Sequence, residues 1–306
     1  MPSDAEAAVW EPDPAWTRLA PPRASTAGVF LVSHRDARAV VKRLVAPTGA
    51  RFRGAEDRPE AATDPGHWAY WRREAEVATA GVVAATSGLR APVLLDCAED
   101  GDGITLVWEW VPAADDVAAA DRARALGRFA AEPVPVTGWT SRPSLGARLR
   151  ARDDARGWPE LASSPIAGVA AMLWHQRDRL LTSYAGLPAV PSHGDAILAN
   201  VRAAAEPGTL VAVDWSALGH HPVGSDLGTL LLSVRQPLGP LVDSYLCGAV
   251  AGGLVLREAD VVHGAAVVAA YTLLTRTAHA VGGPEEERAV TEALRFEGLL
   301  EALVEV

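Results

Sequence analysis

The sequence predicts an α+β fold of two lobes, a small one built on an antiparallel sheet with one helix and a larger, mainly helical one. A chain of 306 residues is long enough for about two such units. Before Pro112, short apolar segments bounded by turn residues are typical of strands, and one stretch has helical spacing. After Pro112, apolar residues recur at helical spacing over most of the chain. We therefore expect the two lobes to meet near Pro112.

A β-hairpin is the first element that the pattern predicts. It follows residues 1–25, which are rich in Pro, Ala and acidic residues and are interpreted as a loosely ordered arm. The sheet-based lobe is expected to cover residues 26–111. Within it, residues 28–32 and 37–44 are largely apolar and flank a polar turn, which is the pattern of two paired strands. Lys42 lies on the second of these strands.

The rest of the small lobe is expected to contain a loop, a helix and a second strand pair. Residues 46–66 hold Pro, Gly, Asp and Arg without periodicity and predict a long loop. From residue 66 to residue 85, Trp and Ala recur at helical spacing among charged residues, which predicts a helix. Residues 92–97 and 104–110 predict two strands joined by an acidic turn.

The larger lobe is expected to cover residues 112–306 and to be built mainly from helices. Residues 118–131 predict a helix, residues 133–159 an irregular segment, and residues 160–185 a long helix. An apolar, β-branched run over residues 209–213 predicts a buried strand. Further apolar helices are expected at residues 226–235, 239–252, 257–281 and 285–304.

Composition and charge exclude several classes of protein. The formal net charge of -10 argues against a non-specific nucleic-acid binder, which needs a basic surface. No apolar run reaches the roughly 18 residues of a membrane span, and the acidic N-terminus lacks the apolar region of a signal peptide. Cys97 and Cys247 have neither metal-site spacing nor a disulfide pattern. We expect a cytoplasmic enzyme without membrane or nucleic-acid partners, and the sequence leaves its oligomeric state open.

Three oxygen-bearing side chains in the second lobe point to phosphate chemistry. Asp195 stands in a short loop, Asn200 follows it in the same loop, and Asp214 ends the predicted strand. Carboxylate and amide oxygens suit Mg²⁺ together with a bound phosphate. Phosphoryl transfer needs such ligands, a cation on the phosphates and a carboxylate that orients the acceptor hydroxyl. We therefore expect Asp195 to orient and deprotonate the hydroxyl, and Asn200 and Asp214 to hold the metal.

Two rare residue types coincide with this constellation. Lys42 is the only lysine among the 28 Lys and Arg residues, and Asn200 is the only asparagine. A coding bias that replaces Lys with Arg would spare a lysine where a compact ammonium is required, as at a buried phosphate. Lys42 is accordingly expected to bind the phosphates. Glu74, on the predicted helix, is expected to pair with it, because Glu76 would face another side of that helix.

The loop around Asp195 carries a motif of known spacing. Asp195, four residues and Asn200 are arranged as in the catalytic loop of the protein-kinase-like fold. The form His193-Gly194-Asp195 resembles the aminoglycoside phosphotransferase family of that fold, although the apolar residues 196–199 depart from the His, Pro or Gly often found there. Further segments that resemble the family are residues 40–42, 71–74, 107–111, 213–215 and 221–227. The similarity spans about residues 26–280.

The resemblance implies the two-lobed protein-kinase-like fold and several further site residues. Backbone groups of Glu109 and Val111 would hold the adenine between the lobes. Gly28 belongs to the segment that would cover the phosphates. His193 would orient the catalytic loop, and Asp226 would brace it.

The resemblance also implies a phosphotransferase that uses ATP, or GTP, and Mg²⁺ to phosphorylate a hydroxyl. The leading prediction for the acceptor is a small molecule such as an aminoglycoside, a sugar or an amino alcohol. The alternatives are a kinase for Ser or Thr of a peptide in natural-product maturation, and a nucleotide-binding pseudokinase that acts with a partner. A wide apolar groove along residues 131–159 would favour the peptide, and a compact acidic pocket would favour a cationic sugar. Trp139 and Trp158, near the ends of that segment, are expected to contact the substrate.

Overall fold

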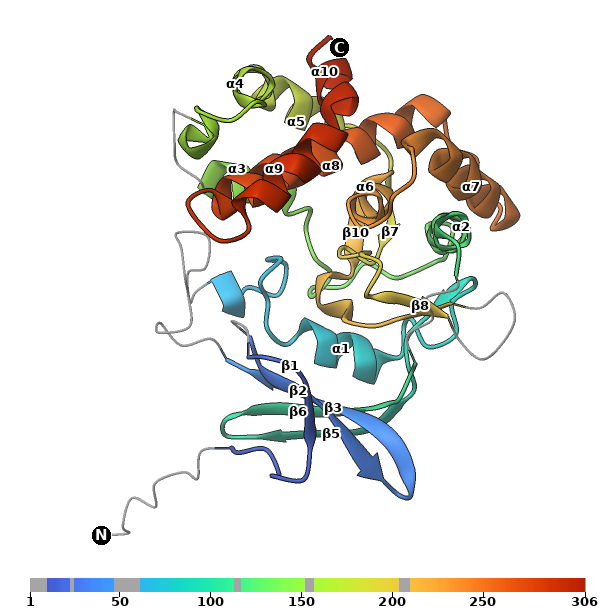
Figure 1. Cartoon of the computed structure of the whole chain (residues 1–306). Helices are drawn as coiled ribbons and strands as arrows, with labels where there is room; N and C mark the ends of the chain where they lie inside the picture. The colour runs from blue at the N-terminus through green and yellow to red at the C-terminus, as the bar shows by residue number, and fades with distance from the viewer. Residues whose placement is uncertain are drawn as a thin grey trace.

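A sheet-based lobe and a larger helical lobe lie one above the other in Figure 1. The computed structural model describes residues 10–22, 25–46, 61–112, 117–151, 157–203 and 210–305. Helix α1 packs on the sheet of the small lobe, and the helical lobe carries the larger hydrophobic core. The predicted two-lobed α+β architecture is confirmed.

Antiparallel pairing builds the sheet of the small lobe, in the order β1-β2-β3-β6-β5. These strands are β1 (Thr17–Ala20), β2 (Thr26–His34), β3 (Ala37–Val45), β5 (Leu94–Asp100) and β6 (Gly103–Glu109). β2 and β3 form the predicted hairpin. Arg35 and Asp36 make its turn with positive φ angles of 49° and 67°, as a two-residue turn between twisted strands requires. Lys42 lies on β3 between Val29 of β2 and Leu106 of β6.

Strand β1 lies within the segment that the sequence suggests is a loosely ordered arm. Thr17 pairs with Leu31 of β2, so this part of the segment extends the sheet. Trp10, Trp16 and Phe30 form an aromatic cluster with ring centroids 5.8, 6.1 and 6.3 Å apart. The contacts of these rings hold β1 at the edge of the sheet, which the composition of β1 alone does not predict.

Helix α1 (Arg73–Ala80) is shorter than the helix predicted over residues 66–85. Residues 64–72 instead form turns whose carbonyl groups surround the Arg73 side chain. Gly81 ends α1 in the left-handed region, at a φ of 64°. Most of the loop predicted over residues 46–66 lies outside the described residues, and near its end residues Ala61–Thr63 form a short 3₁₀ turn.

Helix α8 (Glu258–Ala280) is the central element of the helical lobe and contacts α5, α6, α7, α9 and α10. It is long and apolar enough to cross a membrane, but 72% of its most apolar window is buried inside the lobe, as in a core helix. The other helices are α2 (Ala119–Phe129), α3 (Leu145–Ala151), α4 (Ala167–His175), α5 (Arg177–Ala185), α6 (Ser225–Leu231), α7 (Leu238–Ala251), α9 (Glu286–Arg295) and α10 (Glu297–Glu305).

Two of the predicted helices are each divided into two. The helix expected over residues 160–185 is α4 and α5, which separate at Gln176, and the one over residues 285–304 is α9 and α10, which separate at Phe296. The first break lets the two halves pack on different partners, since α4 contacts α10 whereas α5 contacts α8. Helix α3 lies inside the segment that was expected to be irregular.

Two small sheets frame the loop that carries Asp195. β7 (Ala189–Ser192) leads into the loop and pairs with β10 (Gly219–Pro222). After the loop, β8 (Val201–Ala203) pairs with β9 (Leu210–Ala212), which is the predicted strand. β9 also pairs in parallel with β4 (Leu89–Arg90), which precedes Pro112 in the chain. The two parts of the chain are therefore joined by strand pairing close to this loop.

Candidate active site

A tight turn at Gly194 opens the loop over residues 193–200. Gly194 has a φ of 83°, and a Cβ there would lie 2.3 Å from the carbonyl oxygen of Ala217, so glycine is required. The turn directs the N–H groups of His193 and Gly194 at the Asp226 carboxylate, at 2.7 and 2.8 Å. These two hydrogen bonds tie the 193–200 loop to the start of α6.

His193 connects the same loop to the strand that precedes Asp214. The N–H of Asp195 donates to its Nδ1 at 3.3 Å, so this ring nitrogen accepts. Nε2 then carries the proton and donates to the carbonyl oxygen of Val213 at 3.0 Å. The buried ring also packs on Trp215, with centroids 4.6 Å apart. His193 is therefore engaged on both nitrogens and one face, which is the environment of an orienting residue.

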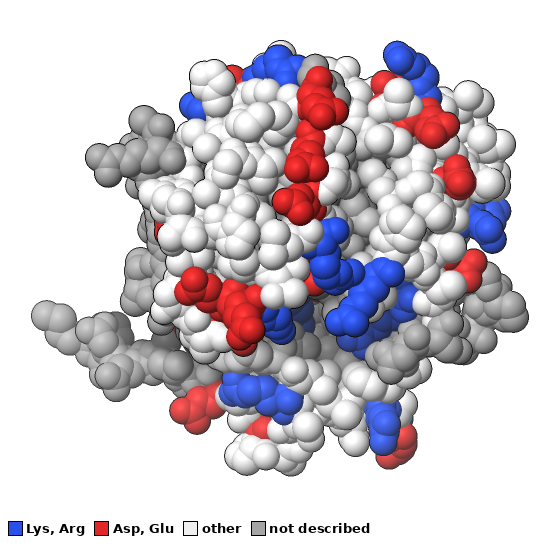
Figure 2. Space-filling model, turned by 45° about the horizontal axis from the view of Figure 1, so that its top comes forward, with Lys and Arg blue, Asp and Glu red and all other residues white. Residues whose placement is uncertain are grey.

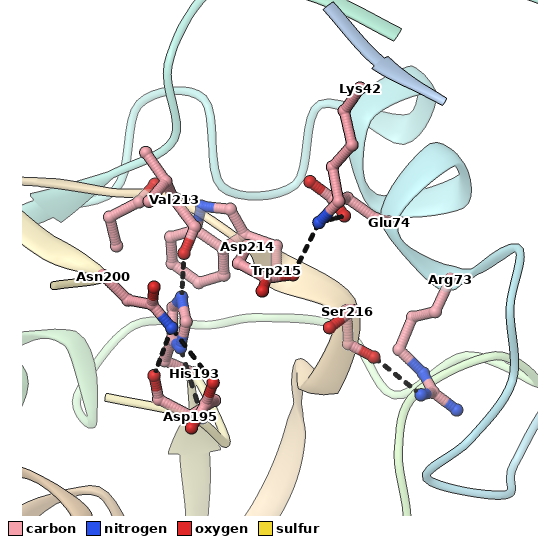
Figure 3. Close-up of polar contacts among 11 residues, drawn as sticks. Lys42, Arg73, Glu74, His193, Asp195, Asn200, Val213, Asp214, Trp215 and Ser216 are labelled. Atoms are coloured by element: carbon pink, nitrogen blue, oxygen red, sulfur yellow. Dashed lines mark hydrogen bonds and ion pairs between the residues drawn. The ribbon is translucent and has the colours of Figure 1, made fainter. Parts of the chain in front are cut away.

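Asp195 and Asn200 face each other across the 193–200 loop (Figure 3). Asn200 Nδ2 donates to Oδ2 of Asp195 at 3.0 Å and to its carbonyl oxygen at 2.9 Å. Because the amide nitrogen is used in this way, Oδ1 of Asn200 points away from Asp195. The loop thus presents one carboxylate held from the side and one amide oxygen that is open to a ligand.

Lys42 lies between two carboxylates that come from different elements. Its Nζ is 2.7 Å from Oδ1 of Asp214 and also pairs with Oε2 of Glu74 on α1 (Figure 3). Burial opposes the charge of the lysine, but the attraction of Asp214 and Glu74 outweighs it, so the pKa of Lys42 is raised. The same ammonium lowers the pKa of Asp214 to about 2. Lys42 therefore stays protonated and Asp214 stays ionised at neutral pH.

The side chains of Asn200 and Asp214 fit a site in which the protein and bound phosphates together hold a divalent metal. Among the described residues, no cluster of three or more His, Cys, Asp or Glu side chains could hold a metal alone. Oδ1 of Asn200 and the second carboxylate oxygen of Asp214 are oxygen donors of the kind that Mg²⁺ uses when phosphates and water complete its ligands. The carboxylates also outnumber the single ammonium, so a phosphate would need a further cation to bind beside them. The donor set thus fits Mg²⁺ held with a nucleotide.

Two cavities meet at these residues. One of about 330 Å³, here called the apolar cavity, has aliphatic side chains in its walls, among them Val29, Val40, Ile197 and Val213. The other, of about 350 Å³ and here called the α8 cavity, is lined by residues of α1, α3, α6 and α8. The residues that line both are Thr26, Lys42, Glu74, Asp195 and Asp214. The charged groups therefore stand where a ligand of one cavity would meet a ligand of the other.

The segment between the lobes lines the apolar cavity through Glu109 and Val111. The Glu109 carboxylate pairs with Arg90 at 2.8 Å, and the main-chain N–H of Glu109 donates to the carbonyl oxygen of Val93 at 2.9 Å. The Val111 carbonyl oxygen accepts a hydrogen bond of 3.0 Å from Arg202. These two main-chain groups are therefore engaged within the protein.

Gly28 is not among the residues that line either cavity. A Cβ at this position would lie 2.7 Å from the ring of Phe30, so the glycine makes room for the aromatic cluster on the sheet. Ser25 and Thr26 line the α8 cavity instead. Gly28 therefore has a packing role, and the covering of phosphates by its segment stays a prediction.

Neither tryptophan that was expected to contact substrate lines one of these cavities. Trp158 is 5% exposed and packs against Trp174 and Tyr271, with centroids 5.1 and 6.0 Å away. Trp139 is half-buried against the core of the helical lobe. Both are packing residues, because the segment that carries them folds onto the core. The aromatic residues that do line the α8 cavity are Trp68, Tyr70, Trp71 and Tyr184.

Arg73 is the most important residue of this region that sequence reasoning missed. Its guanidinium is fully buried and donates to five carbonyl oxygens at 2.5–3.1 Å, those of Pro65, His67, Trp68, Trp139 and Ser216. Burial lowers the pKa of Arg73 to about 10, so it stays charged at neutral pH.

Arg73 lies beside both segments that carry the carboxylates of the site. Ser216 follows Asp214 closely in the chain, and Arg73 directly precedes Glu74 (Figure 3). Arg73 therefore links the two segments whose carboxylates hold Lys42. The sequence offered one signal for this role: Arg73 stands four residues before the buried Val77, a spacing that puts both side chains on the same face of α1.

Comparison with known proteins identifies the family. The family model described as "Phosphotransferase enzyme family" (APH) matches residues 18–259. The structure is similar to a choline/ethanolamine kinase family protein from Mesorhizobium loti, with a TM-score of 0.55, 17% identity, and 94% of this chain and 88% of that one covered. It is also similar to the choline kinase LicA from Streptococcus pneumoniae, with a TM-score of 0.57, 13% identity, and 94% and 93% covered.

A third similar structure is an amicoumacin kinase in complex with AMP-PNP and Ca²⁺, with a TM-score of 0.53, 13% identity, and 94% and 88% covered. Among curated proteins, no sequence matches this chain. The structural similarity to these proteins shows a shared kinase-like fold. The family match, which covers most of the chain, shows that this protein belongs to the APH family of phosphotransferase enzymes and is a kinase that acts on a hydroxyl group.

Proposed function

We propose that this chain transfers the γ-phosphoryl group of ATP to a hydroxyl of a small molecule, with Mg²⁺ as the metal. The observation that carries the proposal is the wall that the two cavities share. A nucleotide whose base occupies the apolar cavity would place its phosphates near Lys42 and Asp214. An acceptor in the α8 cavity would place its hydroxyl near Asp195.

Asp195 would act as the base. Its carboxylate lines both cavities and is held from one side by Asn200. It would orient the acceptor hydroxyl and take its proton while the hydroxyl oxygen forms a bond to the γ-phosphorus. The bond between that phosphorus and the bridging oxygen breaks, and ADP leaves. Lys42, held by Glu74, would bind phosphate oxygens from the nucleotide side.

Asn200 and Asp214 would hold the metal. When bound, Mg²⁺ neutralises charge that develops on the phosphates. The apolar stretch in the 193–200 loop also has a place in this proposal, because Ile197 and Ala199 line the apolar cavity. They would contact the base of the nucleotide, and the acceptor would be bound by other segments.

The α8 cavity suits a small molecule better than a peptide. Its volume of about 350 Å³ falls in the usual range of small-molecule sites. Its walls carry hydroxyl groups suited to a polar ligand, those of Ser141, Ser144, Tyr184, Thr229 and Thr272. The presence of Lys42, Asp195 and Asp214 in one wall supports catalysis over the role of a pseudokinase.

Replacing the single lysine of the chain tests the role given to it. Lys42→Arg keeps the positive charge, but a planar guanidinium cannot occupy the point between Glu74 and Asp214 as a compact ammonium does. We expect kcat/KM for ATP to fall about 10²–10³-fold, as for the loss of one preorganised charge-stabilising donor. The measurement is transfer of label from γ-labelled ATP to hydroxylated small molecules, repeated with GTP.

Arg38→Lys is the matched control, since Arg38 is an exposed arginine on the same strand, β3. This variant should retain the activity of the unmodified chain. If Lys42→Arg were as active as the control, Lys42 would not be the phosphate-binding cation, and the proposed arrangement would be wrong.

A further inference from the structure

The α8 cavity has a basic wall, formed by two arginines. Arg148 of α3 and Arg276 of α8 both line it. Val268, Thr272 and Arg276 follow one another at helical spacing, so one face of α8 turns toward the cavity. Arg276 is exposed and makes no ion pair or hydrogen bond with a residue of the described ranges. Figure 2 shows basic side chains grouped beside the hollow between the lobes.

Each carboxylate that lines the α8 cavity either has a partner within the protein or would act on the acceptor hydroxyl. Glu74 and Asp214 both pair with Lys42. Asp226 accepts hydrogen bonds from two N–H groups of the 193–200 loop. Asp195 is the group that would meet the acceptor hydroxyl. Among the described residues that line the cavity, no other acidic side chain is present to pair with an amino group of an acceptor.

Arginines also cover the aromatic rings near the cavity. Trp68, Trp71 and Tyr70 each have a guanidinium carbon over one face, at 4.6, 5.0 and 5.7 Å from the centroid, from Arg148, Arg72 and Arg73 respectively. These are distances of cation–π contacts. A ring face that holds a guanidinium is not available to an ammonium group of a ligand. One face of each of these three rings is therefore already taken by an arginine of the protein.

The buried His221 lies near two of these arginines, Arg73 and Arg148. It is 7% exposed, lines the cavity, and its Nε2 has no hydrogen-bond partner among the described residues. Burial is the main reason that the pKa of His221 is lowered to about 4, and the charges of Arg73 and Arg148 lower it further. The imidazole is therefore neutral at neutral pH and brings no positive charge to this wall of the cavity.

We propose that the acceptor carries an anionic group, a carboxylate or a phosphate, in addition to the hydroxyl that is phosphorylated. Arg148 and Arg276 bind the anionic group while the hydroxyl meets Asp195. Arginine suits this task because its planar fork forms paired hydrogen bonds with carboxylates and phosphates. The inference rests on the proposed function, and it narrows the small-molecule acceptor of that proposal to one that carries an anionic group.

Transfer of label from γ-labelled ATP to a panel of acceptors tests the inference. The panel compares hydroxy acids and sugar acids, sugar phosphates, uncharged sugars and polyols, and amino alcohols with aminoglycosides. We expect transfer to an anionic arm, and the carboxylate and phosphate arms identify the anion. Calorimetric titration of the same compounds into the protein with AMP-PNP and Mg²⁺ reports binding without turnover. Transfer to cationic or uncharged members alone, or neither transfer to nor binding of any anionic member, would overturn the inference.

Release of phosphate from ATP without an acceptor reports the proposed function separately. If this release depends on Asp195, the chain handles ATP as proposed, and a panel without an anionic substrate counts against the inference alone. If ATP is neither bound nor hydrolysed, the proposed function itself fails. The two failures are thereby distinguishable.

Variants of Arg276 test the role of the basic wall. Arg276→Ala should raise KM for the anionic acceptor about 10- to 100-fold, the effect of losing one hydrogen-bonded charge, with KM for ATP unchanged. Arg276→Lys should recover part of the loss, and Arg276→Glu should shift the preference toward amino alcohols. Arg257→Ala is the matched control, because Arg257 is an exposed arginine at the other end of α8. Equal KM for the acceptor in Arg276→Ala and Arg257→Ala would contradict the assignment.

Discussion

Asp195→Asn is expected to lower kcat about 10²–10⁴-fold while ATP binds nearly as it does to the unmodified chain. The carboxamide keeps the shape of the side chain but cannot take the proton of the acceptor hydroxyl. The 193–200 loop should keep its conformation, because it is held by Asp226 and His193 through main-chain hydrogen bonds. Single-turnover transfer from γ-labelled ATP measures the chemical step, and titration with AMP-PNP measures nucleotide binding.

Asp243→Asn provides the control for this substitution. Asp243 is an exposed aspartate on α7, outside both cavities. This variant should keep full turnover. Full turnover in Asp195→Asn would refute the assignment of the base, whereas loss of nucleotide binding in that variant would show that the loop itself had been disturbed.

Arg73→Ala is expected to lower the free energy of unfolding by about 3–5 kcal/mol, because several buried carbonyl groups lose their donor. Its guanidinium holds the turn before α1, the carbonyl of Trp139 and the carbonyl of Ser216. Displacement of the segment around Asp214 should also reduce kcat about 10- to 100-fold, since a small misplacement of a catalytic group has effects of this size. Urea unfolding gives the stability, and kcat is measured well below the unfolding midpoint.

Two further variants show whether the pattern of donors matters. Arg73→Lys restores the charge but cannot reach five carbonyl groups, so it should recover a small part of the stability. Arg72→Ala removes the neighbouring arginine, whose ion pair with Glu99 is exposed, and should change stability by about 1 kcal/mol or less. If Arg73→Ala and Arg72→Ala had equal effects on stability, Arg73 would not be the link described above.

The sequence predicted the elements that are set by local pattern. The hairpin that carries Lys42 has an apolar run on each side of a polar turn, and this periodicity specifies its register. The rarity of Lys42 and Asn200, and the spacing from Asp195 to Asn200, drew attention to residues that the structure places close together. Lys42 and Asp195 lie in the shared wall of the cavities, and Asn200 lines the apolar cavity. The hairpin was predictable because its signal lies within a few residues of chain, whereas the roles given to Lys42, Asp195 and Asn200 stay predictions.

Features that depend on contacts between distant segments could not be predicted. The strands β4 and β7 are two and four residues long, and each forms because a partner from elsewhere in the chain lies beside it. Trp158 was expected at the substrate because it lies near the end of an irregular segment, but that segment folds onto the core. The spacing to Val77 indicates that Arg73 faces the core, but only the carbonyl groups that other segments bring around it make it a buried link.

The stereochemical course at phosphorus tests the central claim most directly. The two cavities meet at Lys42, Asp195 and Asp214, so the phosphoryl group should pass directly from nucleotide to acceptor, with Asp195 as base and not as nucleophile. ATP made chiral at the γ-phosphorus by isotopic labelling is incubated with the enzyme, Mg²⁺ and the acceptor found in the panel, and the configuration of the product is determined. Direct transfer predicts inversion of configuration. Retention, which requires a covalent phosphoenzyme, would contradict the account.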